Sequence, residues 1–329
     1  MTDLPRVSVV SAFYNRGSRV RESVGSLLAQ TYPNLEVVIV DDGSTDDTLA
    51  ELRAIDDPRL TILSRGNRGF VASINEAIRA SSGAFVAIHG SGDISFPDRI
   101  ARQAQVMIDD PATGVVGCWV EDDETVGEGT LVFRPPAGLP FHQALLTRNL
   151  FTHGESMFRR ALYDQVGGYR EFFRYAQDRD LWLRISRHAE YAIVPDILYR
   201  RFKPAGGVSA DPQKLVLQAY LSDFAVQCAR AVDRGEADPL ERHGYLAAFL
   251  RQRPERLGRK LAWYGARLMV QGDFARGWPV IEQARSEAGS WQVRMIHALA
   301  GLHTSPFLWE RIGRPILTRR LAFFRQSDD

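Results

Sequence analysis

Residues 7–48, VSVVSAFYNRGSRVRESVGSLLAQTYPNLEVVIVDDGSTDDT, decide the fold of this chain. Residues 7–10 and 37–40 are β-branched runs with little alternation, which predicts two strands covered on both faces. Between them, apolar residues recur at helical spacing over 18–30, which predicts a crossover helix. A strand, a helix and a second strand in this order indicate a parallel sheet.

An acidic turn, Asp41-Asp42-Gly43-Ser44, follows the second of these strands. Ligands of open α/β sheets bind beyond the carboxyl ends of parallel strands. An unpaired carboxylate is costly to bury, so we expect Asp41 to contact a ligand. Asp42, Gly43 and Ser44 could instead form a tight strand-to-helix turn. Ser44 with Asp47 three residues later predicts a capping box that opens the next helix.

Strands and helices continue to alternate beyond this unit, which predicts an α/β fold with a mostly parallel central sheet and helices on both faces. The predicted elements are strands at 59–64, 84–88 and 115–120 and helices at 71–78 and 97–108. Residues 123–140 are rich in Gly and Pro, which predicts loops or a hairpin. After Lys214 helical patterning dominates, including two helices joined by Gln271-Gly272-Asp273. This pair resembles one tetratricopeptide-type hairpin, but one copy does not make a repeat array.

Composition excludes several classes of protein. Of the 329 residues, 45% are hydrophobic and 25% are charged, as in ordinary soluble globular proteins. A net charge of +1 gives no electrostatic reason to expect nucleic acid. Cys118 and Cys228 lie far apart without a Cys/His cluster, so no disulfide framework or zinc site is expected and a reducing cytoplasm fits. We see neither a signal peptide nor an apolar run that would span a bilayer.

A second chemical region lies in the middle of the chain. His153-Gly154-Glu155-Ser156-Met157-Phe158-Arg159-Arg160 leads to Val166-Gly167-Gly168-Tyr169 and then to Ala176-Gln177-Asp178-Arg179-Asp180-Leu181-Trp182-Leu183-Arg184. A carboxylate at a helix start, such as Asp178, is held by backbone N–H groups and can point into a cleft as a general base. The alternative is that Asp178 only caps the helix. Asp180 is expected to cap the helix or to pair with Arg184 at helical spacing.

These motifs, in this order, resemble family 2 glycosyltransferases with the GT-A fold. The resemblance covers about 5–210 and implies a Rossmann-like GT-A domain at 1–212, with a nucleotide-binding half at about 1–120 and an acceptor half at about 121–212. A helical extension would occupy 213–329. Asp178 matches the position of the family's catalytic base, although Gln177 replaces the Glu that usually precedes it.

The resemblance also implies which residues contact the donor. The nucleotide-binding positions are Ala12, Tyr14, Asp41, Asp42, Arg65, Gly92 and Asp93. Diphosphate or sugar contacts are implied for His89, Ser91, Asn75, Arg200 and Arg201, with Lys203 as a further cation in a segment that reaches Ser209. Each cation is also compatible with a surface or structural role, and Asn75 is equally compatible with a place on a helix face.

The metal-binding motif of the family is the point at which this sequence departs. An Asp-x-Asp-Asp motif is expected before Pro97-Asp98-Arg99, but Gly90 and Gly92 replace its first two carboxylates. Asp93 alone could hold Mn²⁺ or Mg²⁺, and one carboxylate makes a poor site unless phosphates and water supply the other oxygens. Three alternatives follow: weak metal binding, metal-independent transfer through cations and backbone N–H groups of Gly90-Ser91-Gly92, or an inactive relative that only binds.

The predicted function is inverting transfer of a sugar from a UDP-, dTDP- or GDP-sugar to a hydroxyl of a glycan or lipid-linked glycan, in surface polysaccharide or lipopolysaccharide synthesis. The alternative is a nucleotide-sugar-binding or scaffold protein without catalysis, which would not need Asp178. A dinucleotide oxidoreductase is a third alternative, and the sequence disfavours it because Tyr14-Asn15-Arg16-Gly17 stands where a Gly-x-Gly-x-x-Gly motif belongs.

The carboxy-terminal segment 303–326 mixes apolar residues with arginines. It is expected either to contact the inner face of the membrane peripherally or to pack on the helical region. Pro315 predicts two short helices here rather than one.

Overall fold

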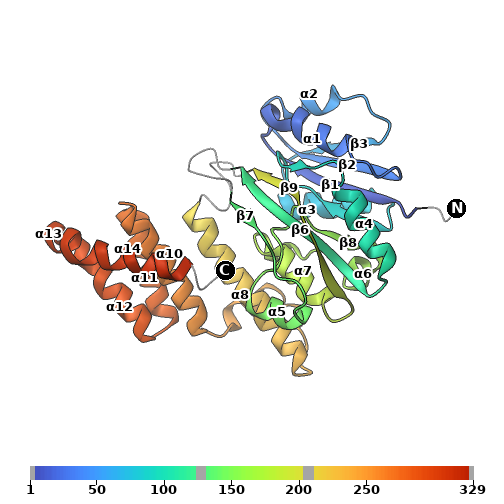
Figure 1. The fold of residues 1–329 in the computed structure, drawn as a ribbon. Coiled ribbons are helices and arrows are strands. Elements are labelled where there is room, and N and C mark those ends of the chain that lie inside the picture. Colours follow the sequence, from blue (N-terminus) through green and yellow to red (C-terminus); the bar gives the residue numbers. More distant parts are fainter. Residues whose placement is uncertain (1–3, 124–130, 203–210, 326–329) are drawn as a thin grey trace. The chain divides into compact units, whose positions relative to one another are not determined.

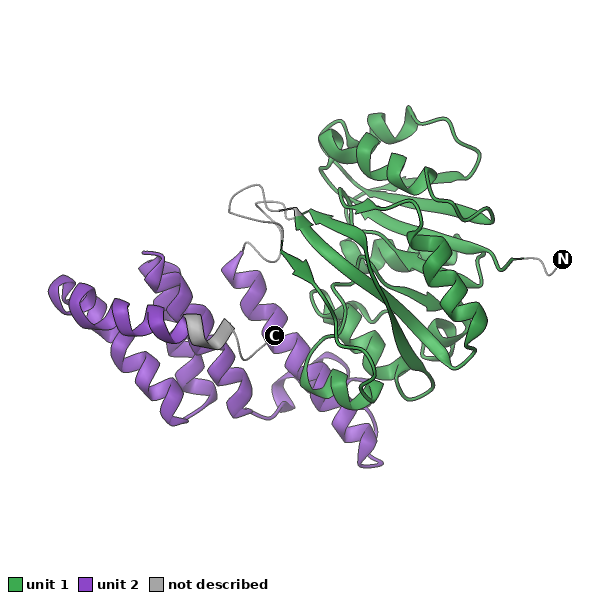
Figure 2. Cartoon of the chain, viewed as in Figure 1, with its two compact units in different colours: residues 1–204 green, residues 205–329 purple. Residues whose placement is uncertain are grey.

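The structure is a computed structural model that describes residues 4–123, 131–202 and 211–325. The chain divides into two compact units, residues 1–204 and 205–329, which are coloured separately in Figure 2.

Unit 1 is an α/β unit, as the sequence predicts, and its elements are labelled in Figure 1. In chain order they are β1 (Val7–Phe13), η1 (Gly17–Arg19), α1 (Val20–Leu28), β2 (Leu35–Asp42), α2 (Thr48–Arg53), β3 (Leu60–Arg65), α3 (Phe70–Arg79), β4 (Phe85–Ile88), β5 (Ile94–Ser95), α4 (Arg99–Asp109), β6 (Thr113–Asp123), β7 (Val132–Phe133), α5 (Phe141–Thr147), β8 (Met157–Arg159), α6 (Arg160–Gln165), η2 (Glu171–Phe173), α7 (Gln177–Ile185) and β9 (Glu190–Phe202).

These strands form one sheet in the order β3-β2-β1-β4-β8-β6-β9-β5, with β7 paired to β6. The pairs β1–β2, β1–β4, β2–β3 and β6–β9 are parallel, which confirms the mostly parallel sheet. β8 pairs antiparallel with both β4 and β6, and β5 pairs antiparallel with β9. β7 runs antiparallel to β6, which confirms a hairpin within 123–140 although residues 124–130 lie outside the described part of the chain.

Helices cover both faces of the sheet. Successive strand residues point to opposite faces, so the burial of neighbouring residues reports on the two faces separately. Val9 and Val37 belong to one core cluster with residues of α1 and α4, such as Val24 and Ile100. The alternate strand residues, such as Val10, are also fully buried but lie outside this cluster, and α3 contacts β1 and β2. The continuous apolar strands are thus explained by burial on both sides.

The predicted capping box at Ser44 and Asp47 is wrong. α2 begins at Thr48, whose N–H donates to Oδ1 of Asp46 over 3.0 Å. The Ser44 hydroxyl instead accepts the backbone N–H of Asn15 over 3.0 Å. The Ser44 side chain, which local spacing assigned to the helix start, is therefore used by Asn15, a residue distant in sequence.

Unit 2 is helical throughout its described residues. Its elements are α8 (Pro212–Asp233), α9 (Pro239–His243), η4 (Gly244–Leu250), α10 (Glu255–Val270), α11 (Phe274–Glu287), α12 (Trp291–Gly301), η5 (Leu302–Thr304), α13 (Pro306–Leu308), the π-helical turn η6 (Trp309–Gly313) and α14 (Arg314–Arg325). The predicted hairpin is present as α10 and α11, which approach closely where a Cβ on Gly265 would lie 2.8 Å from the carbonyl oxygen of Gly277.

The carboxy-terminal segment is helical on both sides of a π-helical turn, with Pro315 in the first turn of α14. The break therefore precedes Pro315, as expected for a residue that cannot donate a helical hydrogen bond. Trp309 and Leu317 are buried in the core of unit 2. Phe307 and Ile312 are exposed, with 63% and 42% of their surface accessible. Packing on the helical unit thus accounts for only part of the apolar side chains. No helix in the described ranges is both long enough and apolar enough to cross a bilayer.

Candidate functional site

The loops that follow β1 and β2 form one connected edge at the carboxyl ends of these strands. The backbone N–H of Asn15 donates to Oγ of Ser44 over 3.0 Å, and the backbone N–H of Arg16 donates to Oγ1 of Thr48 over 2.7 Å. Asn15 has a φ of 51°, a conformation that Asn tolerates better than most residues. These bonds hold the segment after β1 against the acidic turn after β2.

Asp41 lies at the tip of β2, with only 1% of its surface exposed. Its contacts are long: the Ser64 hydroxyl lies 3.3 Å from Oδ2 and the Ser44 N–H lies 3.4 Å from Oδ1. Both donors are neutral, so the carboxylate keeps acceptor capacity. Ala12 is buried in the neighbouring strand, and Tyr14, which is 45% exposed, follows that strand. This geometry suits the predicted nucleotide contacts.

Asp42 has a different environment, since its carboxylate is occupied by the protein. Oδ1 accepts the N–H of Arg68 and Oδ2 accepts the N–H of Gly69, each over 2.9 Å. Gly69 has a φ of 88°, which favours Gly, and precedes α3. Asp42 therefore holds the loop before α3. This geometry favours a structural role for Asp42 over contact with a ligand.

Arg65 and Asn75 are also engaged with other parts of the protein. Nη1 of Arg65 lies 3.3 Å from Oδ1 of Asp42, and its Nε forms an ion pair with Glu76. The Asn75 amide donates to the carbonyl of Tyr169 over 3.0 Å and accepts from the Tyr163 hydroxyl over 2.6 Å. Arg65 is thus neutralised by two carboxylates, and Asn75 supports the turn at Tyr169.

His89 is not a cation. It is fully buried between the hydroxyls of Ser23 and Ser95, at 2.9 Å from Nε2 and 3.2 Å from Nδ1. Burial lowers its pKa to about 3, so the ring is neutral at physiological pH. This corrects its place among the cations expected to face the diphosphate.

The loop Gly90-Ser91-Gly92-Asp93 is built around Asp93. Oδ2 accepts from the Tyr199 hydroxyl over 2.6 Å and Oδ1 accepts from the backbone N–H of Phe202 over 2.7 Å. Burial raises the pKa of Asp93, against these hydrogen bonds. Both oxygens therefore tie the loop to β9. Ser91, between the two glycines, is half-buried.

The two glycines of this loop leave no room for the side chains of the family motif. A Cβ on Gly90 would lie 2.2 Å from Oδ2 of Asp93. A Cβ on Gly92, whose φ is 95°, would lie 3.2 Å from the Phe202 ring and 3.5 Å from Cβ of Arg19. A Cβ on Gly90 would overlap the Asp93 carboxylate, one on Gly92 would be tight against Phe202, and Asp93 uses both of its oxygens within the protein. The residues present therefore do not fit a divalent cation. The described part of the chain also contains no cluster of three His, Cys, Asp or Glu side chains that could hold one.

Arg200 and Arg201 are both paired with carboxylates on the neighbouring strand. The pairs are Arg200 with Glu121 at 2.5 Å and Arg201 with Asp122 at 2.7 Å, in the β6–β9 register. Lys203 and Ser209 lie outside the described residues.

Arg16 is the cation at this edge that the sequence analysis missed. It follows β1 and is half-buried, and Nη1 donates to the carbonyl of its neighbour Asn15 over 2.9 Å. Its Nε is buried without a hydrogen-bond partner among the described residues. Burial lowers its pKa, and the charges of Asp46 and Asp93 only partly oppose this effect. The signal was available in its position directly after Tyr14-Asn15.

Asp178 is the second residue of α7 and has only 9% of its surface exposed. The side chain of α7's cap position, Ala176, makes no capping bond, and Asp178 itself accepts the amide of Asn149 over 2.6 Å. Oδ1 of Asn149 is buried without a partner among the described residues. The structure thus does not support a capping role for Asp178, and it identifies Asn149 as a residue that orients the carboxylate.

The surroundings of Asp178 connect it to α3. The charge of Asp178 acts on buried His153, whose pKa is lowered mainly by burial. His153 has a φ of 80°, its Nε2 lies 2.8 Å from the Tyr169 hydroxyl, and its ring packs edge-on against Phe70 at the start of α3. A single buried cluster therefore spans α3 and the region of α7.

Asp180 is structural, as predicted. It accepts from Arg184 over 2.8 Å and also forms an ion pair with Arg170, which the sequence analysis did not identify. Leu181 and Trp182 are fully buried, as expected for core residues.

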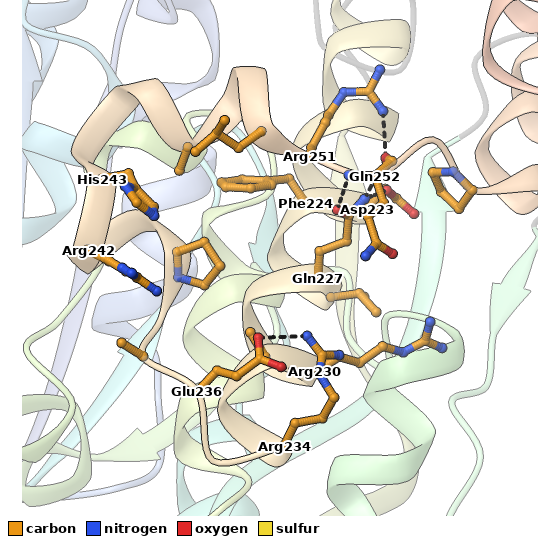
Figure 3. A pocket seen from close by; sticks show the side chains of 17 residues that line it. Asp223, Phe224, Gln227, Arg230, Arg234, Glu236, Arg242, His243, Arg251 and Gln252 are labelled. Carbon is orange, nitrogen blue, oxygen red and sulfur yellow. Dashed lines mark hydrogen bonds and ion pairs between the residues drawn. The ribbon is translucent and has the colours of Figure 1, made fainter.

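A pocket of about 280 Å³ lies in unit 2 between α8, α9 and η4 (Figure 3). It is lined by both signs of charge, including Arg230, Arg242 and the ion pair of Arg234 with Glu236 at 2.6 Å. None of the predicted donor or catalytic residues lines it. We assign it no part in the chemistry of unit 1.

Comparison with known proteins identifies the family to which the chain is similar. A family model described as Glycosyl transferase family 2 matches residues 8–167, which include the donor-side loops and end before Asp178. The chain is 32% identical over 190 residues to EpsE of Bacillus subtilis (strain 168), itself assigned as a glycosyltransferase only provisionally. That match covers 56% of this chain and 68% of EpsE.

Other relatives are longer proteins. The chain is 27% identical over 200 residues to a chondroitin synthase of Pasteurella multocida (strain Pm70), covering 60% of this chain but 20% of that protein. It spans about a third (34%) of an uncharacterized glycosyltransferase of Rickettsia felis, at 30% identity over 60% of this chain.

Among solved structures, the chain is similar to the mannosyltransferase PcManGT of Pyrobaculum calidifontis, in complex with GDP-Man and Mn²⁺. The TM-score is 0.56 at 21% identity, over 100% of this chain and 89% of that one, which shows a shared fold. The similarity to EpsE extends over two thirds of that protein, and the family model matches the strands and loops that carry the acidic edge. The chain therefore belongs to the family 2 glycosyltransferases.

Proposed function

We propose that this glycosyltransferase moves a sugar from a nucleoside-diphosphate sugar to a hydroxyl of a glycan or lipid-linked glycan, with inversion at the anomeric carbon and Asp178 as general base. The observation that carries the proposal is the buried Asp178 carboxylate, oriented by Asn149 at 2.6 Å. A base must take the hydroxyl proton on the face opposite the leaving group.

In the proposed step, the acceptor oxygen forms a bond to the anomeric carbon while the bond from that carbon to the diphosphate oxygen breaks. The hydroxyl proton passes to Asp178, and the nucleoside diphosphate leaves with the bonding electrons. Asn149 holds one carboxylate oxygen, so the other can be directed at the acceptor. Asp41, with its two long contacts to neutral donors, is proposed to bind the base of the nucleotide.

The donor is proposed to be linked to UDP, dTDP or GDP. Nucleotide binding should stabilise the folded protein by mass action. A thermal-shift screen of the three nucleotides and their sugars tests this directly, and a transfer assay with the sugars that bind follows. Binding without turnover in any acceptor mixture would favour the alternative of a scaffold protein that binds nucleotide sugars without catalysis.

A divalent cation is a family possibility, since the similar mannosyltransferase was solved with Mn²⁺. The residues of this loop do not fit one, because Asp93 uses both oxygens within the protein and Gly90 has no space for a side chain. The backbone N–H groups of Gly90 and Gly92 already donate to the hydroxyls of Tyr199 and Ser23, over 2.8 and 3.2 Å. We therefore propose that the leaving diphosphate is stabilised without metal, chiefly by side-chain cations.

The acceptor is proposed to belong to a surface polysaccharide or lipopolysaccharide, made on the cytoplasmic face of the membrane. Exposed Phe307 and Ile312 beside Arg311 support peripheral contact through 303–326. Truncation before His303 would also remove Trp309 and Leu317 from the core of unit 2, so the test replaces the exposed side chains instead, as Phe307→Ser with Ile312→Ser. A variant that stays folded but no longer sediments with anionic liposomes supports the contact, whereas binding that persists contradicts it.

A further inference from the structure

The starting point is a charge imbalance at the carboxyl ends of β1, β2 and β4. A leaving diphosphate carries negative charge that must be stabilised as its bond to the sugar breaks. Within the described ranges, the cations that the sequence suggested for this task are paired or neutral: Arg65 faces two carboxylates, Arg200 and Arg201 face one each, and His89 is buried and uncharged. Lys203 lies outside these ranges. Another described cation at this edge is therefore a candidate for supplying the positive charge.

Arg16 has the required charge without a protein counterion. Ion pairs among the described residues do not include it, and its buried Nε has no acceptor. A buried N–H of a charged group without an acceptor is costly in the free protein. A ligand oxygen at this position would remove that cost.

The position of Arg16 is held by the backbone around it. Its own N–H donates to Thr48 Oγ1 over 2.7 Å, and its carbonyl accepts the N–H of Arg19 over 2.9 Å as η1 begins. The charges of Asp46, after β2, and Asp93, after β4, both act on the guanidinium. The backbone of Arg16 is therefore anchored to the segment that follows the acidic turn.

Arg19 lies against the glycine loop itself. Its Nη2 donates to the carbonyl of Gly92 over 3.3 Å, and its guanidinium stacks on the Phe202 ring at 4.5 Å. A Cβ on Gly92 would lie 3.5 Å from Cβ of Arg19, in ordinary van der Waals contact. An arginine thus adjoins the position of the carboxylate that would hold the metal, and it also forms an ion pair with exposed Glu22 at 3.1 Å.

We propose that Arg16, supported by Arg19, binds the diphosphate of the donor and supplies the positive charge that a divalent cation supplies in relatives with an Asp-x-Asp motif. The proposal rests on the proposed nucleotide-sugar transfer and adds to it the residues of the diphosphate subsite. The loss of two carboxylates and the presence of an arginine without a counterion then have the same explanation. Guanidinium groups bind the diphosphate at the position where relatives use carboxylates and a metal ion. Guanidinium groups suit this role because they are always charged and match phosphate oxygens in pairs.

Calorimetry with nucleotides tests the proposal, in buffer that contains a chelator. The probes are UDP, dTDP and GDP, with uridine, thymidine and guanosine as the matching nucleosides without phosphate. The variants are Arg16→Gln, Arg19→Gln and Arg16→Lys, and the control is Arg21→Gln, which removes the same charge from an exposed side chain paired with Glu51. The Arg16 side chain bonds only to the carbonyl of Asn15 among the described residues, so its variants should fold, and thermal unfolding checks this.

The expected result is a loss of about 10- to 100-fold in diphosphate affinity for Arg16→Gln, a smaller loss for Arg19→Gln and partial recovery for Arg16→Lys. Nucleoside affinity should be equal in all variants, and the control should bind like the unaltered protein. Equal diphosphate affinity in Arg16→Gln, or equal losses for diphosphate and nucleoside, overturns the subsite while nucleotide binding stands. Diphosphate binding that requires added Mn²⁺ also overturns it. If the unaltered protein binds none of the three nucleotides, the proposed function itself fails, and this inference fails with it.

Discussion

The two chemical regions of unit 1 differ in how they treat their carboxylates. After β4, Gly90 and Gly92 replace two acids and the third, Asp93, is bound by Tyr199 and Phe202. At α7, Asp178 remains and has its own orienting residue, Asn149. Stabilisation of a leaving group depends on net positive charge, which arginines can supply as well as a metal. Proton removal needs a base at one position, which no distant group replaces.

The largest expected effect comes from removing that base. Asp178→Asn should lower turnover by ~10²–10⁴-fold and leave nucleotide affinity nearly unchanged, because the amide keeps the size of the side chain but cannot take a proton. Steady-state transfer kinetics and calorimetry with UDP or GDP measure both quantities. A loss of binding equal to the loss of rate would mean that Asp178 belongs to the donor site instead.

The next largest effect tests whether the loop Gly90-Ser91-Gly92-Asp93 has space for a carboxylate of the family motif. Gly90→Asp restores a family carboxylate but should lower the free energy of unfolding by roughly 2–3 kcal/mol, because the new Cβ would meet Asp93 in a buried site. Chemical denaturation measures this value. Gly66→Asp is the control, since a Cβ there has open space. A stable Gly90→Asp variant that gains Mn²⁺-dependent activity would show that the metal site is merely vacant and not filled.

Asp41 should matter for binding more than for stability. Asp41→Ala should weaken nucleotide affinity by ~1.5–3 kcal/mol, the value of a hydrogen bond to a charged group. Its few long contacts to neutral donors predict a small change in unfolding temperature. Calorimetry with UDP, dTDP and GDP measures the affinity, with exposed Asp109→Ala as the control. Unchanged affinities for all three nucleotides would remove Asp41 from the site.

The smallest expected effect is that of metal. Chelator or added Mn²⁺ should change transfer activity by less than about twofold, because a single occupied carboxylate makes a poor cation site. Initial rates over a Mn²⁺ and a Mg²⁺ titration measure the effect. Activity that disappears with chelator and returns at micromolar Mn²⁺ would erase the contrast between the two regions.

Features that depend on short spacing could be predicted from the amino-acid sequence alone. The periodicity of apolar residues and the β-branched runs predicted β1, α1 and β2. Helical spacing predicted both the α10–α11 hairpin and the Asp180–Arg184 pair. These succeed because neighbours three or four residues apart on a helix, or two apart on a strand, meet whatever the rest of the chain does. The motif order also identified the family.

Only the tertiary structure decided the state of each charged side chain. Arg200 meets Glu121 because β9 lies in register with β6, and Asp42 meets the amides before α3. His89 is neutral because the fold buries it. Such pairings join residues many positions apart, and burial sets their charge through the cost of desolvation. Residue type and position in the sequence suggested which cations could face the donor. Which of them has no counterion, as Arg16 does, depends on the tertiary packing.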